Sequence, residues 1–269
     1  MNYEDSVRYI LSLGRELAAP RQPAPSKASG TAAQKFDLRN ISVLADRMEN
    51  PQRACPCVHV AGTNGKGSTA AMLESILRAA GLRTGLYTSP HLVRINERIR
   101  VAGEEISDAD FAATFSRVQA FIEVLLASGS LAAHPTFFEC LTAMAFDYFG
   151  NGCHPESRMH RDEGSAFPSD EGRRGPVDFA IYEVGMGGRL DATNIVTPEV
   201  AVITQIDFDH ESFLGHSIEE IAAEKAGIIK PGAWVVSSAE RAEARAVIGR
   251  RCAAQDARLI EVDEIFRIE

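Results

Sequence analysis

Short apolar runs alternate with longer amphipathic segments along most of the chain. Strands are predicted where apolar and β-branched residues cluster between glycine, proline or polar turns. These runs are CVHVAG, TGLYTS, VDFAIYEV, EVAVITQI, WVVSS and RLIEV. VDFAIYEV and EVAVITQI are almost continuously apolar, which is typical of central strands in a parallel sheet that are buried on both faces.

Helical spacing of apolar residues fills the segments between these runs. The N-terminal segment MNYEDSVRYILSLGRELAAP has this spacing, and helices are also predicted over 36–48, 67–80, 108–127, 136–149, 218–229 and 239–255. Ser107 with Asp110 and Ser217 with Glu220 have the spacing of capping boxes at helix starts. Strands that alternate with helices predict an α/β fold, with a mostly parallel sheet flanked by helices.

Two segments break this alternation. Residues 19–34 are rich in Pro, Ala and Ser and predict a flexible connection. Residues 151–176 mix charges, Gly and Pro without a period and predict a disordered surface insert. Cys153, His154 and His160 in that insert could hold a metal ion, but three ligands on such a loop lack a fourth ligand and a rigid frame.

The composition is that of a globular protein, with 45% apolar and 24% charged residues among 269. The net charge of −9 argues against binding to nucleic acid or an anionic membrane, since both require an excess of Lys and Arg. No apolar run approaches the roughly 20 residues of a membrane-spanning helix. Five cysteines without paired CxxC spacing fit a reducing compartment. We therefore expect a soluble cytoplasmic protein in which any phosphate site is local.

A glycine-rich turn lies between the strand CVHVA and the following helix. It consists of Gly62, Thr63, Asn64, Gly65, Lys66, Gly67 and Ser68. Glycines let backbone N–H groups face a phosphate, the helix N-terminus adds partial positive charge, and the lysine neutralises phosphate oxygens of ATP. The serine is placed to contact magnesium. The spacing is shorter than that of a standard P-loop, and a plain turn that packs the strand on the helix is the alternative.

Polar residues also follow two later strands of the predicted sheet. Glu183 ends VDFAIYEV, and the segment DFDH, with His210 last, follows EVAVITQI. Because the carboxyl ends of parallel strands meet at one edge of a sheet, both side chains are expected within reach of one metal ion. A carboxylate is a natural magnesium ligand. The alternatives are an acid that ends a strand for solubility and a histidine with a structural hydrogen bond.

Three further residues leave their role open on the sequence pattern alone. Lys225 lies in the helix IEEIAAEKAGII, where a solvated pair with a glutamate is the plain interpretation. Ser89 begins the polar segment SPHLVRINERIR after a strand end, which could be a solvated loop. Thr136 opens a helix with two aromatic residues, which favours core packing.

Five motifs carry a more specific resemblance. HVAGTNGKGS, GLYTSPHLVRINERIR, EVGMGGRLDATN, DFDHESFLG and IAAEKAGIIK occur in this order over residues 59–230, and together they resemble folylpolyglutamate synthases of the Mur ligase superfamily. The helix region KFDLRNISVLADRMENPQ ahead of them is similar to the lead-in of that family. The resemblance implies a P-loop-containing Mur ligase central domain over 1–269, without the second, C-terminal domain that the family uses in ligation.

The resemblance also implies roles for individual residues. The residues it implies as catalytic are Lys66, Lys225 and His210. The implied magnesium ligands are Ser68, Ser89, Glu183, His210 and, if CO2 carbamylates it to an anionic oxygen ligand, Lys225. Ser89 would also belong to a mobile loop that closes over the substrate. The residues implied to line the site of the pterin-bearing substrate are Thr136, Arg189, Leu190, Asp191 and Ala192.

The implied activity is ATP-dependent ligation of L-glutamate to dihydropteroate or a reduced folate through an acyl phosphate, with ATP and Mg²⁺ bound and the protein a monomer. A P-loop kinase or GTPase is a rival, although no NKxD-like motif is present. The other rival interpretations are a non-catalytic nucleotide-binding module and a related Mur ligase for UDP-muramyl peptides. Because no room remains for the second domain, we expect ATP–Mg²⁺ binding with little ligase turnover from this chain alone.

Overall fold

One eight-stranded sheet organises the part of the chain that the computed structural model describes, which is residues 1–14, 37–152 and 175–265. The strand order is β4-β3-β2-β5-β1-β6-β7-β8. The strands are β1 (Cys57–Ala61), β2 (Thr84–Tyr87), β3 (Ile99–Val101), β4 (Glu104–Glu105), β5 (Phe179–Glu183), β6 (Val200–Ile203), β7 (Trp234–Ser237) and β8 (Arg258–Glu261). All neighbours pair in parallel except β3, which is antiparallel to both β2 and β4. The predicted mostly parallel sheet is confirmed.

Helices connect and cover these strands. Within the described ranges they are α1 (Tyr3–Ser12), α2 (Arg39–Arg47), α3 (Lys66–Ala79), α4 (Asp108–Ala127), α5 (Phe137–Asn151), α6 (Glu211–Leu214), α7 (Ile218–Ala226), α8 (Ala242–Ala254) and α9 (Val262–Ile265), with short 3₁₀ turns η2 (Pro51–Arg53), η3 (Ile95–Arg98) and η5 (Ala192–Ile195). Ser107 and Ser217 cap α4 and α7, because each hydroxyl accepts the N–H three residues on.

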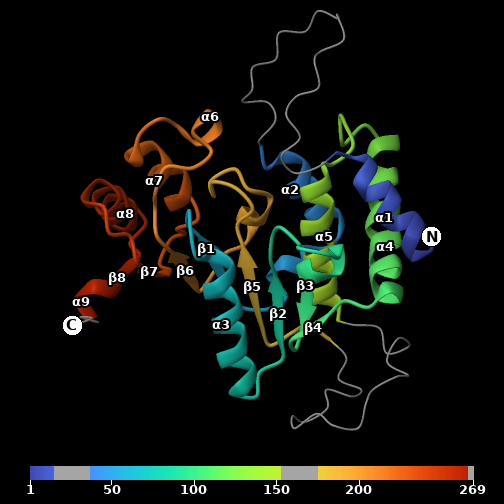
Figure 1. Cartoon of the computed structure of the whole chain (residues 1–269). Helices are drawn as coiled ribbons and strands as arrows, with labels where there is room; N and C mark the ends of the chain where they lie inside the picture. Colours follow the sequence, from blue (N-terminus) through green and yellow to red (C-terminus); the bar gives the residue numbers. More distant parts are fainter. Residues whose placement is uncertain (15–36, 153–174, 266–269) are drawn as a thin grey trace, which may run out of the picture.

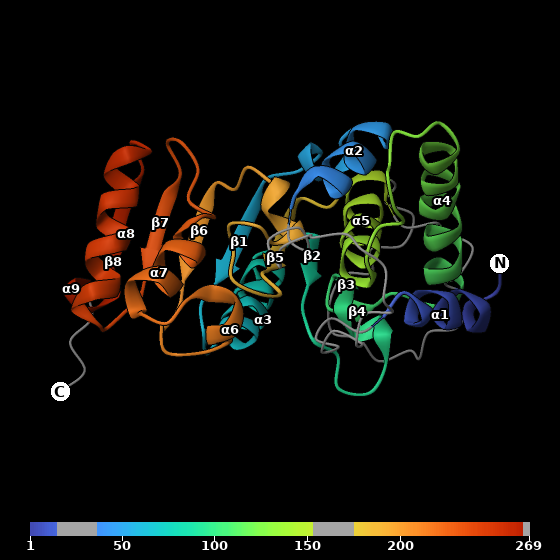
Figure 2. The ribbon, with the colours of Figure 1, turned by 90° about the horizontal axis from the view of Figure 1, so that it is seen from above.

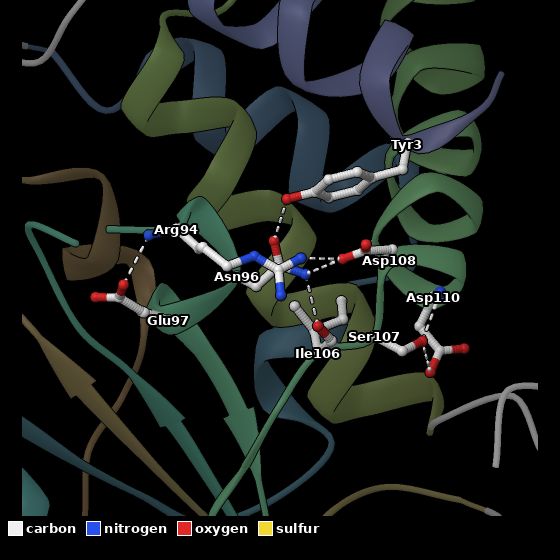
Figure 3. Close-up of polar contacts among 8 residues, drawn as sticks. All are labelled: Tyr3, Arg94, Asn96, Glu97, Ile106, Ser107, Asp108 and Asp110. Carbon is white, nitrogen blue, oxygen red and sulfur yellow. Dashed lines mark hydrogen bonds and ion pairs between the residues drawn. The ribbon is translucent and has the colours of Figure 1, made fainter. Parts of the chain in front are cut away.

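The helices form two unequal layers on the sheet. Val58 and Val60 of β1 pack with residues of α3 on one face, where they form a small core. Cys57 on the other face joins a large core with α1, α2, α4 and α5. Ala61 of the same strand extends that face toward α7 and α8, which build a third core. The sheet therefore lies between α3 on one face and the layer of α1, α2, α4, α5, α7 and α8 on the other, with α1 and α4 at one end and α8 at the other (Figures 1 and 2).

The sequence pattern missed the antiparallel extension of the sheet. β3 and β4 lie in IRVAGEE, and β3 includes Ile99 and Arg100, the last two residues of the segment expected to be a mobile loop. Ala102 and Gly103, both with positive φ, make the tight turn between them. Ile99 and Val101 point into the large core. The pattern failed because two strands of three and two residues are too short to show a period of two.

Helix boundaries differ from the predicted ones by a few residues. The helix predicted over 36–48 is Arg39–Arg47, and it stops where Glu49 and Asn50 take left-handed backbone angles. The helix predicted over 218–229 ends at Ala226. The predicted connection at 19–34 and nearly all of the predicted insert at 151–176, including its Cys153, His154 and His160, lie outside the described residues.

Candidate functional site

The glycine-rich turn joins the carboxyl end of β1 to the N-terminus of α3, as predicted. Gly62 has φ 151° and Gly65, the residue before α3, has φ 81°, both in the region that favours glycine. A Cβ on Gly62 would lie 1.8 Å from the hydroxyl oxygen of Thr204, the residue directly after β6. The turn is therefore packed against the residue that follows the neighbouring strand, and it leads into the N-terminus of α3, the end of a helix that favours anions.

Hydrogen bonds tie this turn to the segment that follows β6. The Thr63 N–H donates to Gln205 O at 2.8 Å, and the Thr63 hydroxyl donates to Asp207 O at 2.9 Å. The Asp207 N–H returns a bond to the same hydroxyl at 3.1 Å. Thr204 donates its hydroxyl to Asn64 O at 2.7 Å. The predicted phosphate loop and the predicted DFDH segment thus form one connected unit.

Two lysines converge on the base of the turn. The Lys66 ammonium donates to Gly62 O at 3.0 Å and Thr63 O at 3.2 Å. The Lys225 ammonium, from α7, donates to Gly62 O at 2.8 Å. Lys225 is only 3% exposed, so the plain interpretation of a solvated helix pair is wrong. The structure brings these two predicted residues to one carbonyl oxygen.

The electrostatics of Lys225 are unusual for a lysine. Burial, followed by repulsion from Lys66, lowers the pKa of Lys225 from 10.5 to about 8, while Asp209 acts in the opposite direction. A pKa near 8 leaves a sizeable fraction of the amine neutral at neutral to mildly alkaline pH. The neutral amine is the form that reacts as a nucleophile. The lowered pKa therefore favours covalent chemistry at Lys225 over that at a solvated lysine.

Glu183 ends β5 on the α3 side of the sheet and is 4% exposed. Its carboxylate lies beside the turn, since a Cβ on Gly67 would come 3.4 Å from Oε1. The Ser89 N–H donates to Glu183 Oε2 at 3.0 Å, which brings the second residue after the end of β2 to the same carboxylate. Ser68 is exposed in the first turn of α3. Carboxylate and hydroxyl oxygens at one sheet edge are a donor set that suits Mg²⁺.

His210 is the last residue of the DFDH segment and has φ 47°, just before α6. Its Nε2 lies 3.6 Å from Asp209 Oδ1, and its side chain is partly exposed. In the described part of the chain, no three His, Cys, Asp or Glu side chains gather as a metal site. The predicted set contains only two such residues, Glu183 and His210, so its remaining ligands would be hydroxyls and a modified Lys225.

The segment GMGGRLDATN folds back on the end of α7. Arg189 donates from Nε and Nη2 to Glu224 Oε1 at 2.9 and 2.7 Å, and its N–H donates to Glu224 O. A Cβ on Gly188 would lie 2.9 Å from Glu224 O, so only glycine fits there. Leu190 is partly buried, and Ala192 begins η5 with 5% exposure. This predicted substrate segment therefore borders Lys225 through its neighbour Glu224.

Thr136 lies apart from these residues at the start of α5. Its hydroxyl accepts the Glu139 N–H, and the Glu139 carboxylate accepts the Thr136 N–H in return, which completes a capping box. Phe137 after it is buried in the large core. Thr136 itself is exposed, so it can contact a ligand, and α5 contacts η5 of the substrate segment.

Thr204 and Glu224 contribute to the site and were not predicted. Thr204 lies in the segment EVAVITQI, directly after β6, and its proximity to Gly62 depends on β6 being the neighbour of β1. Glu224 precedes Lys225, and its pairing with Arg189 depends on the fold of two distant segments. The polar pair Thr204 and Gln205 near the carboxyl end of an otherwise apolar predicted strand is a signal that could have indicated Thr204.

The chain is similar to several known proteins. A model of the Mur ligase middle domain matches residues 169–250. The dihydrofolate synthase/folylpolyglutamate synthase of Bacillus subtilis is 41% identical over 214 residues, 80% of this chain and 44% of that protein. The folylpolyglutamate synthase of Lacticaseibacillus casei is 36% identical over 268 residues, 100% of this chain and 53% of that protein. A solved folylpolyglutamate synthase in complex with AMPPCP and folate superposes with a TM-score of 0.76 at 36% identity, covering 97% of this chain and 54% of its own.

The fold, the site and these matches define the class, and the chain belongs to the Mur ligase family. Within that family it is a homologue of the ATP-dependent ligases known as folylpolyglutamate synthase/dihydrofolate synthase. The chain spans about half the length of the curated relatives it matches.

Proposed function

We propose that this chain is the ATP-binding part of a ligase that joins L-glutamate to dihydropteroate or to a reduced folate. The observation that carries the proposal is the convergence of Lys66 and Lys225 on the phosphate turn, beside the Glu183 carboxylate. The family relationship supports it, and one related structure holds AMPPCP and folate together. In the described residues no helix is long and apolar enough to cross a membrane. A cytoplasmic location and a monomeric state stay predictions.

ATP would bind with its phosphates over the α3 N-terminus. Backbone N–H groups of the turn and the Lys66 ammonium would neutralise the transferred phosphoryl group, which is where most of the catalytic work of phosphoryl transfer lies. Lys66 has carbonyl partners at 3.0 and 3.2 Å that it can exchange for phosphate oxygens. The substrate carboxylate would take the γ-phosphoryl group, and the amine of glutamate would then displace phosphate from the acyl phosphate to form the amide.

Magnesium fits the oxygen donors of this edge of the sheet. Glu183, Ser68 and Ser89 would hold it with His210, and the ion would supply charge neutralisation for the phosphates. Lys225 could join this set after its neutral amine adds to CO2 with loss of one proton, which turns a cation into an anionic oxygen donor. The lowered pKa of Lys225 favours that addition.

Substrate binding is assigned to the segment Arg189–Ala192 and to Thr136. Arg189 offers a guanidinium near the turn, already oriented by Glu224. Folate carries carboxylates, which a guanidinium recognises through paired hydrogen bonds. A related Mur ligase of another substrate would share the ATP site and differ here. Affinity for folate against a UDP-linked peptide therefore separates the two alternatives.

The test is release of ADP from ATP and Mg²⁺, with and without dihydropteroate or tetrahydrofolate plus glutamate. ATP binding with little turnover is the result expected for this chain, because it spans half the length of its relatives. Robust glutamate-dependent release would show a complete ligase. Failure to bind ATP would contradict the proposal, and ATP binding without folate binding would favour a non-catalytic nucleotide-binding module.

A further inference from the structure

A buried histidine in the central strand β1 has no part in the proposed chemistry. His59 is 0% exposed and faces away from α3, between the large core and the core under α7. Its register neighbours are Tyr182 in β5 and Ala201 in β6. A polar ring at the centre of a parallel sheet costs free energy unless its hydrogen bonds are made. Among the described residues Nδ1 has no hydrogen-bond partner and Nε2 has one, Thr193, so that partner indicates what the ring does.

That partner begins a directed chain. His59 Nε2 lies 2.8 Å from the Thr193 hydroxyl oxygen. The same hydroxyl donates its proton to Asp191 Oδ1. Because a hydroxyl has one proton, Thr193 must accept from His59, and the imidazole therefore carries its proton on Nε2. The ring thus fixes the direction of the Thr193 hydroxyl toward the carboxylate.

Asp191 connects Thr193 by hydrogen bonds to the turn that follows Glu183. Its Oδ1 also accepts the Thr193 N–H at 3.0 Å, and its Oδ2 accepts the N–H groups of Gly185 and Met186, each at 3.0 Å. The carboxylate is 6% exposed, so these bonds are made in a site that excludes most water. The turn that begins two residues after Glu183 is therefore held from the interior of the sheet.

The charge state of the His59 ring is compatible with its role as a donor to Thr193. Burial, followed by repulsion from Lys230, lowers the pKa of His59 to about 3, so the ring is neutral at physiological pH. Lys230 is occupied with Asn194 O at 2.9 Å. A neutral ring with its proton on Nε2 still donates the one hydrogen bond to the Thr193 hydroxyl on which this chain of contacts depends.

We infer that His59 is a positioning residue which, through Thr193 and Asp191, sets the Gly185–Met186 turn and with it the substrate segment that begins there. The functional part of this inference rests on the proposed function, because it takes Arg189–Ala192 as the folate-contacting segment. Loss of the His59 donor would release Thr193, loosen the turn and weaken folate binding. ATP binding, which depends on the turn after β1 and on the N-terminus of α3, would persist.

Two matched pairs of variants test this. His59→Leu removes the donor, whereas His59→Gln keeps an N–H at similar reach. Thr193→Val removes the hydroxyl, whereas Thr193→Ser keeps it. Thr84→Val is the control for loss of a buried hydroxyl elsewhere. Thr84 is the first residue of β2, and its hydroxyl donates to Glu74 of α3.

The first readout is hydrogen exchange at the Gly185 and Met186 amides in the intact chain. His59→Leu and Thr193→Val should accelerate both amides by about tenfold or more, since a hydrogen bond to a charged group is weakened. His59→Gln, Thr193→Ser and Thr84→Val should leave them near wild type. Unchanged exchange in His59→Leu, or equal acceleration in all five variants, would overturn the inference.

The second readout is the dissociation constant for tetrahydrofolate in the presence of ATP and Mg²⁺. It should rise by about tenfold in His59→Leu and Thr193→Val and stay near wild type in the conservative partners, with ATP affinity constant throughout. Equal loss of ATP and folate affinity would contradict a positioning role. If the wild-type chain binds ATP but no folate, the proposed function fails, and the amide exchange decides the inference by itself.

Discussion

Lys66 and Lys225 donate to the same carbonyl oxygen, that of Gly62, at 3.0 and 2.8 Å. The two ammonium groups come from helices that are far apart in the sequence, α3 and α7. Their repulsion contributes to the lowered pKa of Lys225. Anionic phosphate at this turn would relieve that repulsion by drawing Lys66 away from the carbonyl oxygen of Gly62. Nucleotide binding is thereby linked to the protonation of Lys225.

The fit of Gly62 against Thr204 predicts a local loss of stability. Gly62→Ala should lower the free energy of unfolding by about 2–3 kcal/mol, because its Cβ would overlap the Thr204 hydroxyl at a φ of 151°. Gly65→Ala should cost only about 1 kcal/mol, since its Cβ has open space and only the positive φ is strained. Chemical denaturation measures both.

Relief of the overlap is the control for that explanation. The double variant Gly62→Ala/Thr204→Ala should recover part of the lost stability, because the closest contact involves the Thr204 side chain. Strictly additive losses in the double variant would show that the overlap is not the cause.

Lys225 should make stability depend on pH in a defined direction. A lysine whose folded pKa, about 8, lies below its unfolded value of 10.5 binds fewer protons when folded. Its charging therefore penalises the fold fully below pH 8, and the penalty disappears as pH rises from about 8 to 10.5. The free energy of unfolding of wild type relative to Lys225→Met should rise across that window.

Lys66→Met is the matched test of the repulsion. Removal of the second ammonium should raise the pKa of Lys225 toward its ordinary value. The pH window over which the free energy of unfolding rises should then start at a higher pH. Lys230→Met, which removes a lysine outside the pair, should leave the window unchanged. A wild-type profile parallel to that of Lys225→Met from pH 7 to 10.5 would contradict the lowered pKa.

Glu183 should make ATP binding depend on magnesium. In wild type, Mg²⁺ should tighten ATP binding by a larger factor than in Glu183→Gln, because the buried carboxylate beside Gly67 would be a ligand of the ion. Glu74→Gln is the control, since Glu74 is equally buried in α3 but bonds Thr84 and Arg78. Titrations with and without Mg²⁺ give the ratio, and an unchanged ratio in Glu183→Gln would remove Glu183 from the metal site.

The parallel part of the fold was predictable because each strand is a compact apolar run next to a helix with clear periodicity. The six predicted runs correspond to β1, β2, β5, β6, β7 and β8. β3 and β4 were not predicted, because three and two residues carry no readable alternation and their pairing depends on a distant neighbour, β2.

The candidate site was predictable where residues follow strand ends, as Glu183 and the phosphate turn do. The burial of Lys225 was not predictable from helix periodicity, because a lysine beside a glutamate has the pattern of a solvated pair. Its contact with Gly62, 163 positions away, exists only after β6 and α7 pack beside β1. The same applies to His59, whose strand pattern indicates burial but not its bond to Thr193.

Titration of ATP–Mg²⁺ into this chain and into its Lys66→Ala variant tests the central claim most directly. The account predicts one site in the wild-type chain and an affinity that is weaker by roughly 10- to 100-fold in Lys66→Ala, because the variant removes a charge-assisted bond to phosphate. Lys230→Ala, a lysine away from the turn, should bind ATP as wild type does. Equal affinity of wild type and Lys66→Ala, or no ATP binding by wild type, would contradict it.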